Sequence, residues 1–214
     1  MKVVFGGTFD PVHIGHLRMA NALAESLSVK EVFMMPCYDA VHKHDVGASS
    51  ECRKDMLALA AKNDTLVSLD DRESRRGKSS YTIESLLELR AELGEESLWF
   101  VMGTDAANGF SSWFRVNEFS KLTHVVVVNR VEARCDSIDQ AAVAAKLESL
   151  GFSLSRSLNE LKTEPAGKFI FLDLPLLEIS STDIRERIKQ GLTIRYLVTD
   201  EVRGYICDNA LYQN

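Results

Sequence analysis

Short runs of almost continuously apolar residues alternate with amphipathic segments along most of this 214-residue chain. A run that is apolar at every position, and not only at every second one, is typical of a parallel strand covered on both faces. The expected strands are Lys2–Phe5, Val32–Met35, Leu66–Leu69, Leu98–Met102, Val125–Val128 and Phe169–Leu172. The expected helices span 14–27, 50–62, 81–93, 138–149, 181–190 and 199–209. Strands that alternate with helices predict an α/β fold, a doubly wound parallel sheet with helices on both faces.

No repeat, low-complexity tract or linker rich in Pro or Gly divides the chain, so we expect residues 1–214 to form a single domain. Residues from 1 to about 175 would form a Rossmann-like core, and residues from about 176 to 214 a small helical C-terminal part. Residues 150–167 carry the weakest pattern, and we expect surface structure there.

The composition excludes several classes of protein. The chain is 45% hydrophobic and 26% charged with a net charge of −6, so it has enough apolar material for a core but no overall basic character for general nucleic-acid binding. It contains no membrane-spanning apolar run and no signal peptide, and its four cysteines have no zinc-ligand spacing. We therefore expect a cytoplasmic protein with reduced thiols and no structural metal site, which could form a homo-oligomer.

The first candidate site follows the first expected strand. A glycine turn leads through Gly6-Gly7-Thr8-Phe9-Asp10-Pro11 to two histidines at the start of a helix, His13 and His16. Glycines let the backbone approach a ligand, and a helix start offers N–H groups to an anion. Histidines three apart lie on one helix face and could point at the same phosphate. The alternatives are polar residues in a first helical turn or two metal ligands, but a structural zinc needs four ligands.

The second candidate site begins the helix predicted over 181–190, in the string Ile179-Ser180-Ser181-Thr182-Asp183-Ile184-Arg185. Ser180 and Asp183 have the spacing of a capping box, so the simplest interpretation is a helix start. The same geometry points the N–H groups of Ser181 and Thr182 at an anion, with Arg185 one turn inside the helix. Because an arginine fork suits phosphate oxygens, we interpret this segment as a phosphate site.

These two strings resemble the T/H-x-G-H and I-S-S-T-x-x-R motifs of the nucleotidylyltransferase superfamily. The longer string from Gly6 to His13 is similar to its bacterial nicotinate mononucleotide adenylyltransferases. The resemblance extends from residue 3 to about residue 207 but is dense only in patches. It implies that His13, His16 and Arg185 are catalytic. It also implies that ATP is bound by Gly6, Gly7, Thr8, Phe9, His13, His16, Gly103, Asp105, Ser181, Thr182 and Arg185.

The remaining marks of this family concern the nucleoside and the acceptor. Asp105, in the family's G-x-D position after Gly103, would bind the ATP ribose, although it could simply cap a helix. Ser80-Tyr81-Thr82 and Trp113 resemble the family's mononucleotide-binding residues, with the tryptophan stacked on the pyridine ring. The alternative for Trp113 is partial burial in the core, which is what we expect of Trp99. Ser80 is also the expected N-cap of the helix over 81–93.

One loop departs from the family pattern. Where the family has P-P-H-K, this chain has Ala40-Val41-His42-Lys43. The resemblance implies that Lys43 contacts the mononucleotide or ATP phosphates, but without the prolines the loop is less rigid. The basic run over 72–78 is interpreted as a solvated loop and none of its residues as a ligand.

The expected activity is adenylyl transfer from ATP to a pyridine mononucleotide, with release of pyrophosphate in NAD biosynthesis. Mg²⁺ would be held by ATP phosphates and water, without a protein carboxylate cage. Nicotinate mononucleotide is the preferred acceptor, and nicotinamide mononucleotide or phosphopantetheine are alternatives. A catalytically silent nucleotide sensor is the alternative from another class, but binding alone would not require both His16 and Arg185. No nucleic acid or membrane partner is expected.

Overall fold

The computed structural model describes residues 1–38, 47–78, 81–130, 139–174 and 177–213, without the side chains of Asp105 and Arg130. The chain divides into two compact units, one formed by Met1–Gly6 and Tyr81–Pro175 and the other by Gly7–Ser80 and Leu176–Asn214. The predicted single domain remains a prediction. Within the described ranges, no helix is both long and apolar enough to span a bilayer.

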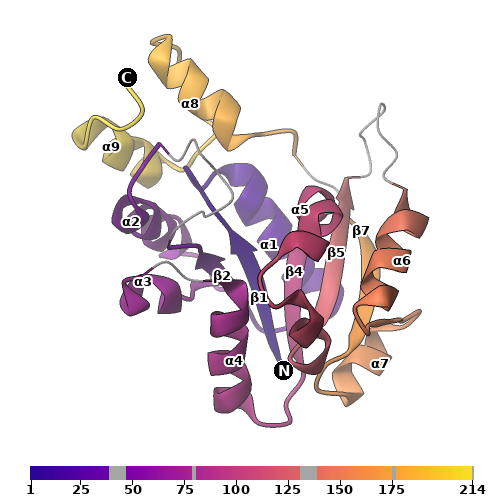
Figure 1. The fold of residues 1–214 in the computed structure, drawn as a ribbon. Helices are drawn as coiled ribbons and strands as arrows, with labels where there is room; N and C mark the ends of the chain where they lie inside the picture. The colour runs from indigo at the N-terminus through magenta and orange to yellow at the C-terminus, as the bar shows by residue number, and fades with distance from the viewer. Residues whose placement is uncertain (39–46, 79–80, 131–138, 175–176, 214) are drawn as a thin grey trace. The chain divides into compact units, whose positions relative to one another are not determined.

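Over the described ranges, seven strands follow the sheet order β3-β2-β1-β4-β5-β7-β6, and every strand pairing described residue by residue is parallel. They are β1 (Lys2–Gly7), β2 (Val32–Pro36), β3 (Val67–Leu69), β4 (Leu98–Gly103), β5 (His124–Arg130), β6 (Ser153–Leu154) and β7 (Lys168–Leu174). The central strands are almost fully buried, as the continuous apolar runs predicted. The predicted α/β fold with a parallel sheet is confirmed (Figure 1).

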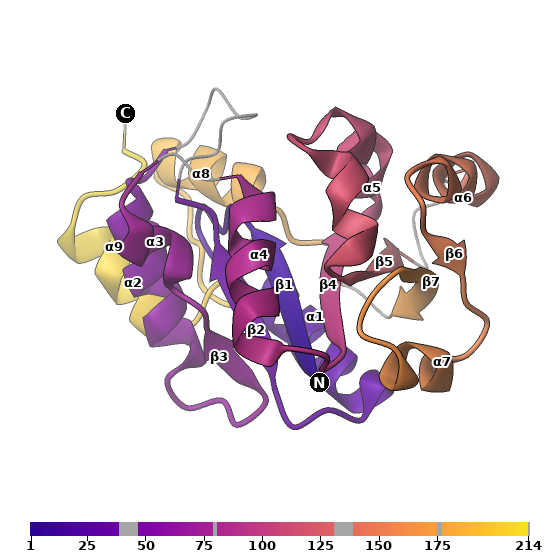
Figure 2. The ribbon, with the colours of Figure 1, turned by 60° about the horizontal axis from the view of Figure 1, so that its bottom comes forward.

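In the first unit, β1, β4, β5, β7 and β6 lie side by side in that order. The helices of this unit are α4 (Thr82–Leu93), α5 (Thr104–Gly109), α6 (Gln140–Ser149) and α7 (Leu158–Thr163), together with 3₁₀ turns at Phe110–Ser112 and Val116–Lys121. Figure 2 shows β6 beside β7, with α6 and α7 at this end of the sheet. The weakly patterned segment 150–167 therefore contains regular elements, β6 and α7, which are too short to give a clear periodicity.

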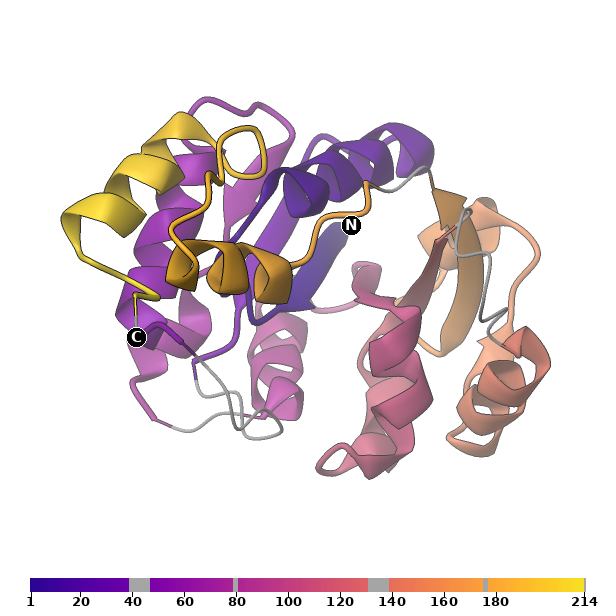
Figure 3. The same cartoon turned by 90° about the horizontal axis from the view of Figure 1, so that it is seen from above.

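The second unit contains β2 and β3 with the helices α1 (Ile14–Leu27), α2 (Ser50–Ala61), α3 (Arg72–Arg76), α8 (Ser181–Lys189) and α9 (Asp200–Asp208). Two pieces of the chain that are far apart in sequence form it together. Helix α9 packs along α2, and Tyr205 on α9 donates a hydrogen bond to the Asp55 carboxylate on α2 at 3.1 Å. Figures 1 and 3 show this packing of the C-terminal helix against α2. Consequently both predicted phosphate motifs belong to the same unit.

Candidate active site

The turn after β1 is built around an aromatic residue. A Cβ on Gly7 would lie 2.7 Å from the Phe9 ring, so only glycine leaves room for this ring. Phe9 has a φ of +50°, in the left-handed region that aromatic residues rarely adopt. Its buried ring meets the His16 ring edge-on, with 5.0 Å between the ring centroids. The glycine turn is thereby fixed against the first helix.

His13 and His16 lie together as the sequence predicted, but His13 is the N-cap of α1 and not part of the helix. Its Nδ1 accepts a hydrogen bond from the His16 backbone N–H at 3.3 Å. Because a backbone N–H can only donate, the neutral His13 ring carries its proton on Nε2, which can donate to a phosphate. The two imidazoles stack, with centroids 3.6 Å apart and planes inclined by 17°.

Helix α8 begins as its capping pattern predicts. Ser180 is the N-cap, and its Oγ accepts a hydrogen bond from the Asp183 N–H at 3.0 Å. One residue later, the Ser181 hydroxyl donates to the Pro11 carbonyl at 2.9 Å. On the next turn, Arg185 Nη1 donates to the Asp10 carbonyl at 2.7 Å. The second motif is therefore bonded directly to the loop between Gly7 and His13, although about 170 residues separate them.

Two residues without a predicted role organise this region. Asp10 is 3% exposed, and its carboxylate accepts hydrogen bonds from Gly47, Ala48 and Tyr212. Arg53 is 1% exposed, and its guanidinium donates to the backbone carbonyls of Thr8, Cys37, Tyr38 and Ala48. Nothing in the sequence distinguishes Arg53 from an exposed helical arginine, and Asp10 has the pattern of a turn residue before proline.

The half-buried Cys37 is adjacent to this cluster. Burial raises its pKa above the usual range of a cysteine, although the Arg53 guanidinium acts in the opposite direction. A buried thiol with a raised pKa is a weak nucleophile. Cys37 belongs to the packing around Arg53, whose Nη1 donates to the Cys37 carbonyl at 2.7 Å.

Most of the predicted nucleoside and acceptor residues belong to the other unit, namely Gly103, Asp105, Tyr81, Thr82 and Trp113. Gly103 ends β4 and is the N-cap of α5, which begins at Thr104. A Cβ on Gly103 would meet no atom within 4 Å, so its environment is open. Asp105 lies in the first turn of α5, and its predicted contact with ribose stays a prediction.

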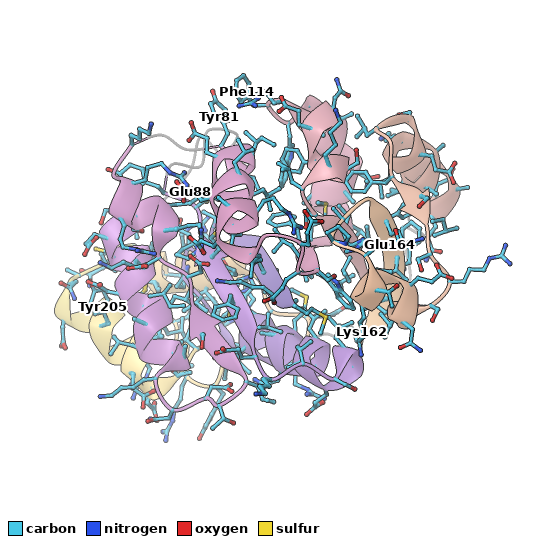
Figure 4. All side chains as sticks on the ribbon, turned by 90° about the horizontal axis from the view of Figure 1, so that it is seen from below. Tyr81, Glu88, Phe114, Lys162, Glu164 and Tyr205 are labelled. Carbon is cyan, nitrogen blue, oxygen red and sulfur yellow. The ribbon has the colours of Figure 1, made fainter. Side chains whose placement is uncertain are left out.

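Trp113 is half-buried, and three aromatic rings meet it roughly edge-on, those of Phe100, Phe110 and Phe119. These three contacts restrict the orientation of the indole. Tyr81 and the exposed Phe114 lie close together, with ring centroids 4.5 Å apart (Figure 4). Trp99 is a core residue as expected, but it is fully and not partially buried. The structure thus brings aromatic residues together around two predicted mononucleotide residues, Tyr81 and Trp113.

Two sequence interpretations need correction, and two residues cannot be placed. Helix α4 begins at Thr82 with Tyr81 in the N-cap position, one residue later than predicted. Arg72 is not part of a solvated loop, because it is buried and makes a bidentate pair with the buried Asp70 carboxylate. Ser80 and Lys43 lie outside the described residues.

In the described part of the chain, no group of three or more His, Cys, Asp or Glu side chains is arranged to hold a metal ion. A metal bound mainly through nucleotide phosphates would not require such a group.

Comparison with known proteins decides the family. The sequence model of the cytidylyltransferase-like family matches residues 4–187. A "Probable nicotinate-nucleotide adenylyltransferase" of Marinobacter nauticus is 41% identical over 203 residues, which cover 94% of this chain and 92% of that protein. The chain belongs to the nicotinate-nucleotide adenylyltransferase family. A relative of the same name from Cellvibrio japonicus is 40% identical over 211 residues, which cover 98% of this chain and 97% of the relative.

Solved structures of this family share the fold. The Plasmodium falciparum nicotinic acid mononucleotide adenylyltransferase complexed with NaAD has a TM-score of 0.71 at 19% identity, covering 99% of this chain and 98% of that one. The same enzyme complexed with APC has a TM-score of 0.67 at 18% identity, covering 98% and 96%. The family resemblance inferred from the two motifs is confirmed.

Proposed function

We propose that this protein transfers the adenylyl group of ATP to nicotinate mononucleotide, giving nicotinate adenine dinucleotide and pyrophosphate. An oxygen of the mononucleotide phosphate attacks the α-phosphorus of ATP. The new P–O bond forms as the bond between the α-phosphorus and the α–β bridging oxygen breaks, and pyrophosphate leaves with that electron pair. No covalent enzyme intermediate is needed, so catalysis consists of positioning and charge stabilisation.

The observation that carries the proposal is the meeting of two distant motifs in one unit. Ser181 and Arg185 on α8 bond to the carbonyls of Pro11 and Asp10, two and three residues before the His13 N-cap. Imidazole donors, a helix N-terminus and a guanidinium therefore surround one region, as a triphosphate requires. His16 and the backbone of Thr8 and Phe9 would bind the α-phosphate, and His13 would help to align the phosphates.

On the leaving-group side, Ser181, Thr182 and Arg185 would hold the β- and γ-phosphates and stabilise departing pyrophosphate. Gly6 and Gly7 would let the backbone approach the nucleotide. The hydrogen bonds from His16 and from the backbone of Thr8 and Phe9 to the α-phosphate would strengthen as negative charge develops on its oxygens in the transition state. Mg²⁺, bound through the ATP phosphates and water, would supply charge neutralisation.

For the nucleoside and the acceptor, Gly103 and Asp105 would bind the ATP ribose. Trp113 would stack on the pyridine ring, and Ser80, Tyr81, Thr82 and Lys43 would contribute to mononucleotide binding. The edge contacts that fix Trp113 support this assignment, because a stacking platform must be rigid. Nicotinamide mononucleotide is the alternative acceptor, and the names of the relatives favour nicotinate.

The test measures pyrophosphate release with Mg-ATP and three acceptors: nicotinate mononucleotide, nicotinamide mononucleotide and phosphopantetheine. We expect the highest kcat/KM with nicotinate mononucleotide and no release after chelation by EDTA. The His16→Ala variant should lose about 10²- to 10³-fold in kcat, as expected when one preorganised donor is removed. ATP binding without pyrophosphate release for any acceptor would instead indicate a silent nucleotide sensor and refute the proposal.

A further inference from the structure

The Asp10 carboxylate is held by three donors from two segments. Its Oδ1 accepts hydrogen bonds from the Ala48 N–H at 3.1 Å and from the Tyr212 hydroxyl at 2.7 Å, and its Oδ2 accepts one from the Gly47 N–H at 2.7 Å. Asp10 is 3% exposed. A buried carboxylate with this many donors has one stable orientation, because rotation would leave its oxygens unpaired in a dry environment.

The residue that depends most directly on this orientation is Arg185. Its Nη1 donates to the Asp10 carbonyl at 2.7 Å but lies 3.7 Å from Oδ2 of the same residue. Its Nη2 is 3.5 Å from the Thr182 hydroxyl. In the described part of the chain, these contacts use two of the five N–H donors of the guanidinium, which leaves the others for a phosphate. The carboxylate is near enough to compete for them.

Tyr212, close to the C-terminus, prevents this competition. Its ring occupies the space that a Cβ on Gly47 would need, at 2.7 Å, while the Arg185 side chain approaches the same point to 3.0 Å. Burial and the Asp10 charge raise the pKa of the Tyr212 hydroxyl, so it stays protonated and donates. Without that donor, Oδ1 would retain only the Ala48 amide among the described residues, and the carboxylate could turn towards Arg185.

We propose that Asp10 and Tyr212 are positioning residues of the phosphate site, which keep the Arg185 guanidinium directed at pyrophosphate and not closed onto Asp10. The inference rests on the proposed function and extends it, because it makes the C-terminal segment part of the apparatus for the leaving group. Substitutions of Asp10 or Tyr212 should weaken binding of the β- and γ-phosphates of ATP and of pyrophosphate. Acceptor binding should not change.

The test is the Tyr212→Phe variant, which removes one hydroxyl and keeps the ring that packs on Gly47. A hydrogen bond to a charged group contributes about 1.5–3 kcal/mol, so kcat/KM for ATP should fall by about 10- to 150-fold. In the reverse reaction, KM for pyrophosphate should rise, whereas KM for the mononucleotide stays within twofold. Tyr205→Phe is the matched control, because it also removes a tyrosine–carboxylate hydrogen bond, to Asp55 on α2, but in a contact without Arg185.

The coupling with Arg185 separates positioning from simple stabilisation. If Tyr212 acts through Arg185, Tyr212→Phe should cost much less in an Arg185→Lys background than in the wild type. Asp10→Asn should likewise raise KM for pyrophosphate and should remove most of the effect of Tyr212→Phe. Additive effects, or an effect of Tyr212→Phe only on the melting temperature, would overturn the inference. Pyrophosphate release by the wild type in the same assay tests the proposed function. The positioning inference and the proposed function can therefore fail separately.

Discussion

At the scale of single residues, His13 is the N-cap of α1 and, in the proposed function, also a phosphate ligand. Its Nδ1 caps α1 by accepting the His16 N–H, and this contact sets the tautomer with the proton on Nε2, the atom proposed to donate to a phosphate. A Cβ on Gly15 would lie 3.1 Å from the His13 ring, so the glycine provides the space for the imidazole. The G of the T/H-x-G-H motif therefore has a packing reason that is independent of any ligand.

Two substitutions of His13 can separate these tasks. His13→Asn replaces one cap acceptor by another that is favoured at N-caps, whereas His13→Ala removes it at a cost of about 1 kcal/mol. Urea unfolding should therefore show nearly wild-type stability for His13→Asn and reduced stability for His13→Ala. Both variants lack the imidazole and should lose a similar factor in kcat. An active His13→Asn enzyme would show that capping is the only task of this residue.

The sequence predicted the residues of this site that carry recognisable motifs, but not those that hold them. His13, His16, Ser181 and Arg185 could be proposed because helix-start chemistry and phosphate chemistry leave local patterns. The contacts of Asp10 with Tyr212 span 202 positions and follow from tertiary structure alone. Arg53 is buried on α2 among backbone carbonyls, a surrounding that no local pattern encodes.

At the scale of elements, His124 joins the start of β5 to the segment that precedes β7. Its Nδ1 accepts the Lys168 N–H at 3.0 Å, and its Nε2 lies 2.9 Å from the Glu164 carbonyl. Since Nδ1 accepts, Nε2 carries the proton and donates to Glu164. Burial lowers the pKa of this histidine below the ordinary value of 6.5. His124 is therefore neutral and structural in the folded protein.

This assignment predicts how stability depends on pH. Because the pKa is lower in the folded state, the unfolded state binds more protons as the pH falls below 6.5, and the stabilisation that is complete above this pH is progressively lost. The free energy of unfolding by urea should therefore fall more steeply between pH 7 and pH 5 in the wild type than in His124→Gln. Equal slopes for the two proteins would contradict the assignment, whatever their absolute stabilities.

Long elements were predictable and short ones were not. The expected strand over Leu98–Met102 and helix over 14–27 match β4 and α1 to within one residue, since their apolar patterns are long and continuous. Helix α3 has five residues and strand β6 has two. These are too few for the helical or the strand periodicity of apolar residues to be recognised in the sequence. Arg72 on α3 was consequently taken for a loop residue, and its pairing with Asp70 was missed.

At the scale of the whole molecule, the predicted site residues are divided between the two units. The phosphate motifs lie in the unit formed by Gly7–Ser80 and Leu176–Asn214, together with β2 and β3. The described acceptor residues, including Trp113, lie in the unit formed by Met1–Gly6 and Tyr81–Pro175. The sequence indicated a helical C-terminal part, but not that this part folds with the N-terminal third. Gly103 and Asp105, which are proposed to bind the ATP ribose, lie in the same unit as Trp113. If Trp113 serves the acceptor alone, mononucleotide binding can still be weakened without ATP binding.

The Trp113→Ala variant tests this division of tasks. Loss of stacking by an aromatic residue costs about 1–3 kcal/mol, so KM for nicotinate mononucleotide should rise roughly 5- to 150-fold, while KM for ATP changes little. Tyr196→Ala is the control, because Tyr196 is 76% exposed in the other unit and has no proposed part in binding. Steady-state kinetics with each substrate varied in turn provides the measurement, and a thermal melt verifies that the variant is folded. A rise in KM for ATP with unchanged mononucleotide binding would mean that Trp113 serves the adenylyl donor and that the acceptor is recognised elsewhere.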